Sequence, residues 1–136
     1  PMITALKSKF KAEIIVLIRK KMEDVLSDNP KINKVLTYQD NFQKDVQVLK
    51  SEEIDLAVIV WPATFKISLL CLKAGIPYRI GTTQTGLLES NGYFLTRMVK
   101  PSFYQKHKVQ ENLDISRLVN ADLKNPKIEF YFSKKV

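Results

Sequence analysis

The chain has 136 residues, of which 45% are hydrophobic, and this length suits one globular domain with a real core but no second full domain. No apolar run approaches the ~20 residues that a membrane span needs, and no secretory leader opens the sequence, so we expect a cytoplasmic protein. With one cysteine, Cys71, an internal disulfide is excluded and a metal cluster is disfavoured. We expect this thiol to be buried and inert.

The net charge is +8, and the basic residues are unevenly distributed. Between Leu56 and Gln110 the only acidic residue is Glu89. The basic side chains of that stretch are Lys66, Lys73, Arg79, Arg97, Lys100, Lys106 and Lys108. Such a surface suits nucleic acid, anionic lipid head groups, or a phosphorylated or carboxylated small molecule. A basic face that is merely solvated is an equal alternative.

The first third of the chain alternates helical and strand-like patterns. Pro1 to Lys11 is predicted to be an amphipathic helix, and the apolar run from Ile14 to Ile18 a buried strand. A short helix is predicted from Met22 to Leu26, ending before Asn29-Pro30. Ile32 to Tyr38 then resembles a shorter strand, nearer a sheet edge. Apolar residues at helical spacing predict a helix from Phe42 to about Glu53.

The central stretch predicts a strand–helix–strand unit. Leu56 to Val60 is a run of apolar residues typical of a strand that is buried on both faces of a parallel sheet. Pro62 ends the strand, and Thr64 is a plausible N-cap of a helix that Gly75 stops. The next strand is predicted over Tyr78 to Ile80.

The remainder is less periodic. After Gly81 we expect a loop, or a loop with a short strand or turn near Tyr93 to Thr96. A helix is predicted to begin near His107, with Leu113 on its buried side. The aromatic run from Ile128 to Phe132 resembles a strand, which could pair with the sheet edge or belong to a further element.

Strands that alternate with helices predict an α/β fold, a Rossmann-like parallel sheet with helices on both faces. Ligands of such sheets bind beyond the carboxyl ends of the strands. This rule places the candidate site at Trp61 to Ser68 and after Ile80. Trp61 could either stack on a sugar ring or cover the end of the sheet.

Three basic or polar side chains near that site have two interpretations each. Lys66 and Ser68 lie in the first turn of a helix, where free N–H groups attract anions, although Lys66 could be solvated and Ser68 could pack against the strand. Arg79, within a strand, either points into the basic crevice or covers an edge. The P-loop, GxGxxG, HExxH, CxxC and GxSxG motifs are all absent, which disfavours the chemistry that each supports.

His107 is the only histidine, so a Ser-His-Asp triad would have to use it. We favour a helix-start or surface role for His107 over a catalytic one.

The order of several short motifs resembles the amino-terminal domain of glycosyltransferase family 9, the bacterial lipopolysaccharide heptosyltransferases. The run DLAVIVWPATFKISLLCLKAGIPYRIG is followed about 25 residues later by HKVQENL, and PMITALKSKFK and AEIIVLIRK near the start also fit the family. The central and later positions that match are Asp55, Lys66, Ser68, Ala74, Gly75, Arg79, Ile80, Gly81, His107, Val109 and Leu113.

The resemblance implies the N-terminal half of a GT-B glycosyltransferase that lacks its first strand. Residues 1–124 would form the Rossmann-like acceptor-side domain, and residues 125–136 a linker or the first strand of a donor-binding domain. Family members begin with a strand and a G-D turn whose Asp is the candidate base, so no catalytic residue is expected within these residues, and the fragment alone should be inactive. We expect no cofactor and no metal site in these residues.

The implied reaction is inverting transfer of heptose from an ADP-heptose-type donor, bound by the other domain, to the lipopolysaccharide inner core. The partner would be an anionic glycolipid acceptor, with peripheral association at the inner face of the inner membrane and no nucleic acid. The expected substrate contacts or corner supports are Lys66, Ser68, Arg79 and His107. The alternative is a non-catalytic α/β module that presents a basic surface to nucleic acid or a protein partner.

Overall fold

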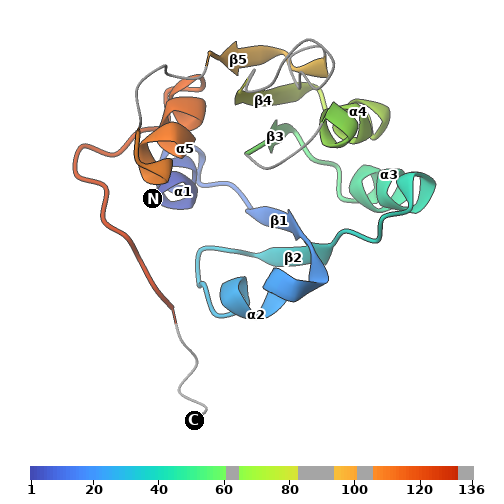
Figure 1. The fold of residues 1–136 in the computed structure, drawn as a ribbon, viewed down its shortest axis with the longest axis horizontal. Helices are drawn as coiled ribbons and strands as arrows, with labels where there is room; N and C mark the ends of the chain where they lie inside the picture. The colour runs from blue at the N-terminus through green and yellow to red at the C-terminus, as the bar shows by residue number, and fades with distance from the viewer. Residues whose placement is uncertain (61–64, 83–93, 101–105, 132–136) are drawn as a thin grey trace.

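The computed structural model describes residues 1–60, 65–82, 94–100 and 106–131 (Figure 1). Its elements in chain order are α1 (Met2–Phe10), β1 (Ile15–Ile18), η1 (Lys20–Met22), α2 (Glu23–Leu26), β2 (Lys34–Thr37), α3 (Phe42–Ser51), β3 (Leu56–Val58), α4 (Phe65–Lys73), β4 (Tyr78–Thr82), β5 (Arg97–Val99) and α5 (Lys108–Arg117). The predicted alternation of helices and parallel strands is therefore confirmed.

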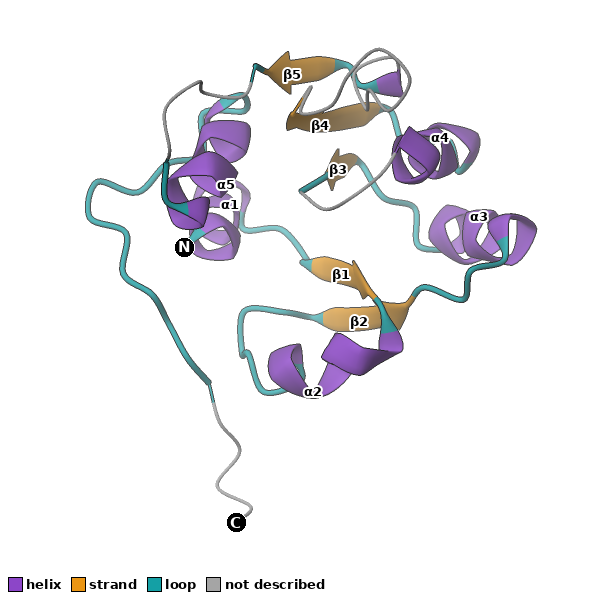
Figure 2. Cartoon of the chain, in the orientation of Figure 1, coloured by secondary structure: helices purple, strands orange, loops and turns teal. Residues whose placement is uncertain are grey.

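The strands form two hydrogen-bonded groups. β1 pairs with β2 in parallel, and β4 lies between β3 and β5, parallel to both. Figure 2 shows the strands following one another in the order β5, β4, β3, β1 and β2, with α3 and α4 on one side and α1 and α5 on the other. The fold class is the predicted one, with the sheet divided between β1 and β3.

Two apolar clusters hold these layers together. Cluster one joins α3, α4 and strand residues; its buried members are Leu49, Ile59, Leu70, Cys71, Ala74 and Ile76, and Leu17, Leu36 and Ala57 pack against them. Cluster two joins α1 and α5; its buried members are Ala5, Leu6, Leu113 and Ala121, and Ile14 and Val58 pack against them. Both clusters therefore draw on residues from the β1 side and the β3 side.

Glycine is required at two positions of the central unit. Gly75 has a φ of 77°, and Ile76 N donates to the Cys71 carbonyl at 3.1 Å, which closes α4 as the sequence predicts. At Gly81 a Cβ atom would lie 2.9 Å from the Ile59 carbonyl oxygen. The close approach of β3 to β4 therefore excludes a side chain at Gly81.

The last two predicted segments have different outcomes. The sequence predicts a loop, or a loop with a short strand or turn, near Tyr93 to Thr96; Thr96 hydrogen-bonds Arg79, and the strand β5 begins one residue later at Arg97. Pairing of the tail with the sheet edge is not seen, because described residues 128–131 form no strand and Ile128 and Phe130 are 58% and 74% exposed. The other interpretation of the tail, as part of a further element, stays a prediction. Phe132 and Tyr93 themselves lie outside the described residues.

Polar contacts of Glu129, and not strand pairing, anchor the C-terminal segment. Glu129 Oε2 accepts hydrogen bonds from Lys31 Nζ at 2.6 Å, the Tyr131 hydroxyl at 2.9 Å and Thr4 Oγ1 at 3.1 Å. The bonds from Lys31 and Tyr131 lower the pKa of Glu129 to about 2. This cluster fastens the segment to α1 and to the loop before β2.

The corner between β2 and α3 is built around a buried carboxylate. Asp45, only 2% exposed, accepts hydrogen bonds from the backbone N–H groups of Gln39 at 3.0 Å and Asn41 at 3.2 Å. Asn41 in turn caps α3, since its Oδ1 accepts from Lys44 N at 3.2 Å. Asp40 lies between the two residues whose N–H groups Asp45 accepts, and it has a φ of 55°.

We predict that Asp45→Ala destabilises the protein by roughly 1–3 kcal/mol, because two backbone donors would lose a buried acceptor. The matched control is Lys44→Ala, an exposed neighbour on α3 whose side chain makes no such contact, with an expected effect within about 0.5 kcal/mol. Urea unfolding measures both. Equal effects of the two substitutions would contradict the assigned role of Asp45.

We also predict a pH dependence of the C-terminal anchor. Because the folded pKa of Glu129 lies below its ordinary value of 4.5, its stabilising contribution is complete above about pH 4.5 and is lost as the pH falls through about 2. The carboxyl carbon shift of Glu129, followed by NMR, should titrate near pH 2. Glu129→Gln should remove the corresponding pH dependence of stability. A midpoint near pH 4.5 would show that the anchor does not form.

Candidate functional site

Lys66 lies where the strand-end rule places a ligand contact. It is exposed in the first turn of α4, and its Nζ lies 3.5 Å from Asp40 Oδ1, at the corner that follows β2. The electrostatic effects of Tyr38 and then of Asp40 raise the pKa of Lys66 above its ordinary value. The carboxyl ends of β2 and β3 therefore share one polar corner, which we call the Lys66–Asp40 corner. Trp61 and Thr64, the other predicted members, lie outside the described residues.

Ser68 and Cys71 face the interior from the same helix. Ser68 is 0% exposed and Cys71 is 6% exposed. The predicted burial of Cys71 is confirmed, and this burial raises the pKa of its thiol to about 11, which disfavours the reactive thiolate. Ser68 therefore lies on the buried side of α4, whereas Lys66 is exposed on the same helix.

Arg79 is held by backbone carbonyls. Its Nε donates to the Phe94 carbonyl at 2.6 Å, and its NH1 donates to the carbonyls of Ile76 at 2.5 Å and Pro77 at 3.4 Å. Arg79 pairs with Ala57 near the beginning of β4. Because α4 runs from Lys66 back to the start of β4, Arg79 and Lys66 lie near opposite ends of the strands. Arg79 covers no sheet edge, because β4 lies between β3 and β5; its guanidinium instead ties together the backbone before β4 and before β5.

His107 is the N-cap of α5, as its predicted helix-start position implies. Its Nδ1 accepts a hydrogen bond from Val109 N at 3.3 Å, and the residue is exposed. α5 packs on α1, whereas α4 packs on α3. Lys66 and His107 therefore begin helices on opposite faces of the sheet (Figure 1).

The four predicted residues do not gather in one pocket of the described structure. Lys66 and His107 are exposed at helix starts, Ser68 is buried, and Arg79 lies at the other end of the α4 unit. The partner that the sequence analysis missed is Asp40. Its signal was available, because Asp40 follows the predicted strand Ile32 to Tyr38 and so lies at a strand carboxyl end.

The basic stretch is partly neutralised by carboxylates from outside it. Lys106 Nζ lies 2.9 Å from Asp114 Oδ2, and Lys108 Nζ lies 2.6 Å from Glu111 Oε2. Lys66 likewise lies near Asp40. All three carboxylates lie outside the stretch from Leu56 to Gln110, in which Glu89 is the only acidic residue. The surface is therefore less strongly basic than the sequence suggests.

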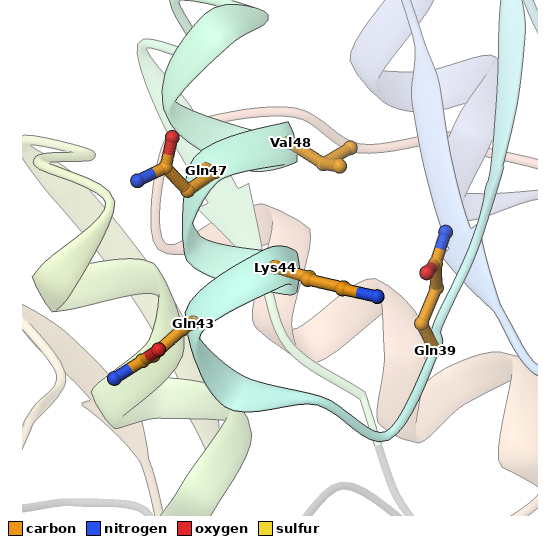
Figure 3. A pocket seen from close by; sticks show the side chains of 5 residues that line it. All are labelled: Gln39, Gln43, Lys44, Gln47 and Val48. Atoms are coloured by element: carbon orange, nitrogen blue, oxygen red, sulfur yellow. The ribbon is translucent and has the colours of Figure 1, made fainter.

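A shallow hollow of about 510 Å³ lies on the outer side of α3. It is lined by Gln39, Gln43, Lys44, Gln47 and Val48. Figure 3 shows Lys44 pointing toward Gln39, whereas Gln43 and Gln47 point the other way, so the side chains do not converge on one ligand position. None of the four predicted site residues lines this hollow.

Over the described ranges, no group of His, Cys, Asp and Glu side chains has the arrangement that a metal ion needs. Across the same part of the chain, no helix combines the length and apolar character needed to cross a membrane.

A comparison with protein-family models found no match, and no curated protein matches the sequence. Among solved structures, the chain is similar to the ADP-heptose lipopolysaccharide heptosyltransferase II of E. coli, with a TM-score of 0.71 and 23% sequence identity. The match covers 85% of this chain and 34% of that one, so the chain spans about a third of the length of the structure it matches. The neighbour is of the enzyme class that the sequence resembles. The predicted glycosyltransferase-like α/β fold is thereby confirmed.

Proposed function

We propose that this chain is the acceptor-side part of a family 9 glycosyltransferase that transfers heptose from an ADP-heptose-type donor to the lipopolysaccharide inner core. The observation that carries the proposal is the agreement of two independent signals. The ordered motifs resemble this family, and the fold is similar over 85% of the chain to a heptosyltransferase. Fold alone does not fix function, so the motif positions are needed for the assignment.

In this proposal the exposed residues contact the acceptor and the buried ones support them. Lys66 and His107 each lie in or just before the first turn of a helix, where N–H groups and the helix dipole favour an anion. A phosphate or carboxylate of the inner core would suit either position. Ser68 and Arg79 would hold α4 and β4 in place, since one is buried and the other is bonded to carbonyls.

The chemistry itself would come from outside residues 1–136. By the family resemblance, a carboxylate deprotonates the acceptor hydroxyl, and the donor diphosphate leaves from a second domain. Residues 125–136 would lead toward that domain, and the site would work at the cytoplasmic face of the inner membrane. The chain described here would bind and orient the acceptor.

The second candidate is a non-catalytic module that binds nucleic acid or a protein through its basic surface. The net charge of +8 favours it. The ion pairs of Lys106 with Asp114 and of Lys108 with Glu111 weaken it, because these two lysines would have to exchange partners to bind phosphate. We therefore place it second.

We predict that a deacylated, phosphorylated inner-core oligosaccharide binds residues 1–136 and that Lys66→Ala weakens this binding about tenfold, since a hydrogen bond to a charged group contributes roughly 1.5 kcal/mol. The matched control is Lys73→Ala, which removes a lysine from the opposite end of the same helix. Calorimetry or NMR titration measures both variants, and Lys73→Ala should leave the affinity unchanged.

Two results would count against the proposed function. The first is heptose transfer by residues 1–136 alone, given ADP-heptose and acceptor, because the base and the donor domain are assigned to other parts of the enzyme. The second is salt-dependent, sequence-independent binding of oligonucleotides without binding of the oligosaccharide, which the second candidate predicts.

A further inference from the structure

Asp40 is an exception among the residues with a left-handed backbone. In the part of the chain that the structure describes, the non-glycine residues with a positive φ are Lys11, Asp40, Glu53 and Asn120. Lys11, Glu53 and Asn120 each follow the last turn of a helix, where a left-handed residue commonly ends the helix. Asp40, with a φ of 55°, lies instead between β2 and α3. Its conformation therefore has no helix-ending role to explain it.

The surrounding structure holds Asp40 in this strained conformation from both sides. A residue with a side chain seldom adopts a positive φ, which glycine adopts freely. Here the buried Asp45 carboxylate accepts hydrogen bonds from the N–H groups of both neighbours, Gln39 and Asn41. Strained residues that their surroundings fix in place are concentrated at functional sites. This arrangement points to a function for the Asp40 side chain.

The Asp40 carboxylate lies beside Lys66 and is accessible to a ligand. Asp40 Oδ1 lies 3.5 Å from Lys66 Nζ, and the two side chains are 80% and 46% exposed. Ion pairs as exposed as this one contribute little to stability, so stabilisation alone does not account for a strained residue here. A cationic donor and an anionic acceptor of hydrogen bonds are thus side by side, both open to solvent.

This pair of groups matches one class of ligand. The Lys66 ammonium binds an anion, whereas the ionised Asp40 carboxylate only accepts hydrogen bonds. A sugar with a phosphate or carboxylate next to free hydroxyl groups satisfies both, because its anionic group meets Lys66 and its hydroxyls donate to Asp40. Inorganic phosphate is attracted by Lys66 but repelled by Asp40. The pair therefore distinguishes anions by the hydroxyl groups beside them.

We propose that Asp40 is a specificity-determining residue for the acceptor and that Asp45 is the positioning residue that sets its direction. In the bound state, Lys66 pairs with an anionic group of the acceptor, and Asp40 accepts hydrogen bonds from hydroxyls beside that group. Asp45 is buried and acts only through the backbone on either side of Asp40. This role rests on the proposed function, which places the acceptor at Lys66.

Two glycine substitutions separate binding from stability. Asp40→Gly and Glu53→Gly each remove a carboxylate from an exposed residue, at φ values of 55° and 51°. Glycine relieves the strain at both positions, so neither substitution should lower Tm. Asp40→Gly should weaken binding of the deacylated, phosphorylated inner-core oligosaccharide to residues 1–136 by about fivefold, whereas Glu53→Gly should leave it unchanged. Calorimetry measures both affinities.

Asp40→Asn tests selectivity while preserving the shape of the side chain. Asparagine tolerates a positive φ but carries no charge. Inorganic phosphate, followed at the NMR signals of the Lys66 side chain, should therefore bind about threefold more tightly. The oligosaccharide loses a charged acceptor, so the ratio of its affinity to that of phosphate should fall about fivefold. A residue that acts only through stability or total charge would leave this ratio unchanged.

Asp45→Asn tests the positioning role. The asparagine amide has one oxygen, so it can replace only one of the two carboxylate oxygens that now accept from Gln39 and Asn41. The affinity ratio should fall as it does in Asp40→Asn, although the charge of Asp40 is intact. The control is Leu6→Ala, which removes a buried side chain of cluster two and should lower Tm without changing the ratio.

The outcomes distinguish this role from the proposed function. Suppose that Lys66→Ala weakens oligosaccharide binding but that Asp40→Gly and Asp40→Asn bind both ligands as Glu53→Gly does. The specificity role of Asp40 is then overturned, and the proposed function stands. An unchanged affinity ratio in Asp45→Asn would overturn the positioning role. Absence of Lys66-dependent oligosaccharide binding by the unaltered chain would overturn the proposed function, and the role of Asp40 with it.

Discussion

The structure depends on apolar contact between two groups of strands, β1–β2 and β3–β5, which do not pair with each other within the described residues. Cluster one packs Leu17 and Leu36 from β1 and β2 with Ala57 and Ile59 at β3, and cluster two packs Ile14 with Val58. These contacts, with the helices that complete each cluster, hold the β1–β2 and β3–β5 groups in one domain. Without them the described strands would form two separate small sheets, and the two-stranded β1–β2 sheet would be too small for independent stability.

This constraint also arranges the candidate acceptor surface. The Lys66–Asp40 corner joins the end of β2 to the start of α4, so its geometry requires that α3 and α4 stay packed in cluster one. Asp45 holds the amides on either side of Asp40 and thereby fixes the second half of the corner. His107, on the opposite face, depends in the same way on the packing of α5 in cluster two.

Most of the fold could be predicted from the sequence, because its signals are local. The apolar period of α3, the glycine stop of α4 and the helix start at His107 are all found where the pattern places them. The tail from Ile128 does not pair with the sheet edge, although its aromatic composition favours a strand, and the contacts of Glu129 with Thr4 and Lys31 depend on residues far away in the chain. The carbonyl contacts of Arg79 and the pairing of Lys66 with Asp40 are equally non-local. The division of the sheet is a tertiary property that no single stretch encodes.

The most direct test of the shared core is residue-resolved unfolding, with amide exchange followed by NMR at increasing urea. If the two clusters join both strand groups in one cooperative unit, the protected amides of β1–β2 and of β3–β5 should open with the same free energy and the same dependence on urea. Separate opening of the β1–β2 pair, at a lower urea concentration and with β3–β5 still protected, would contradict the account.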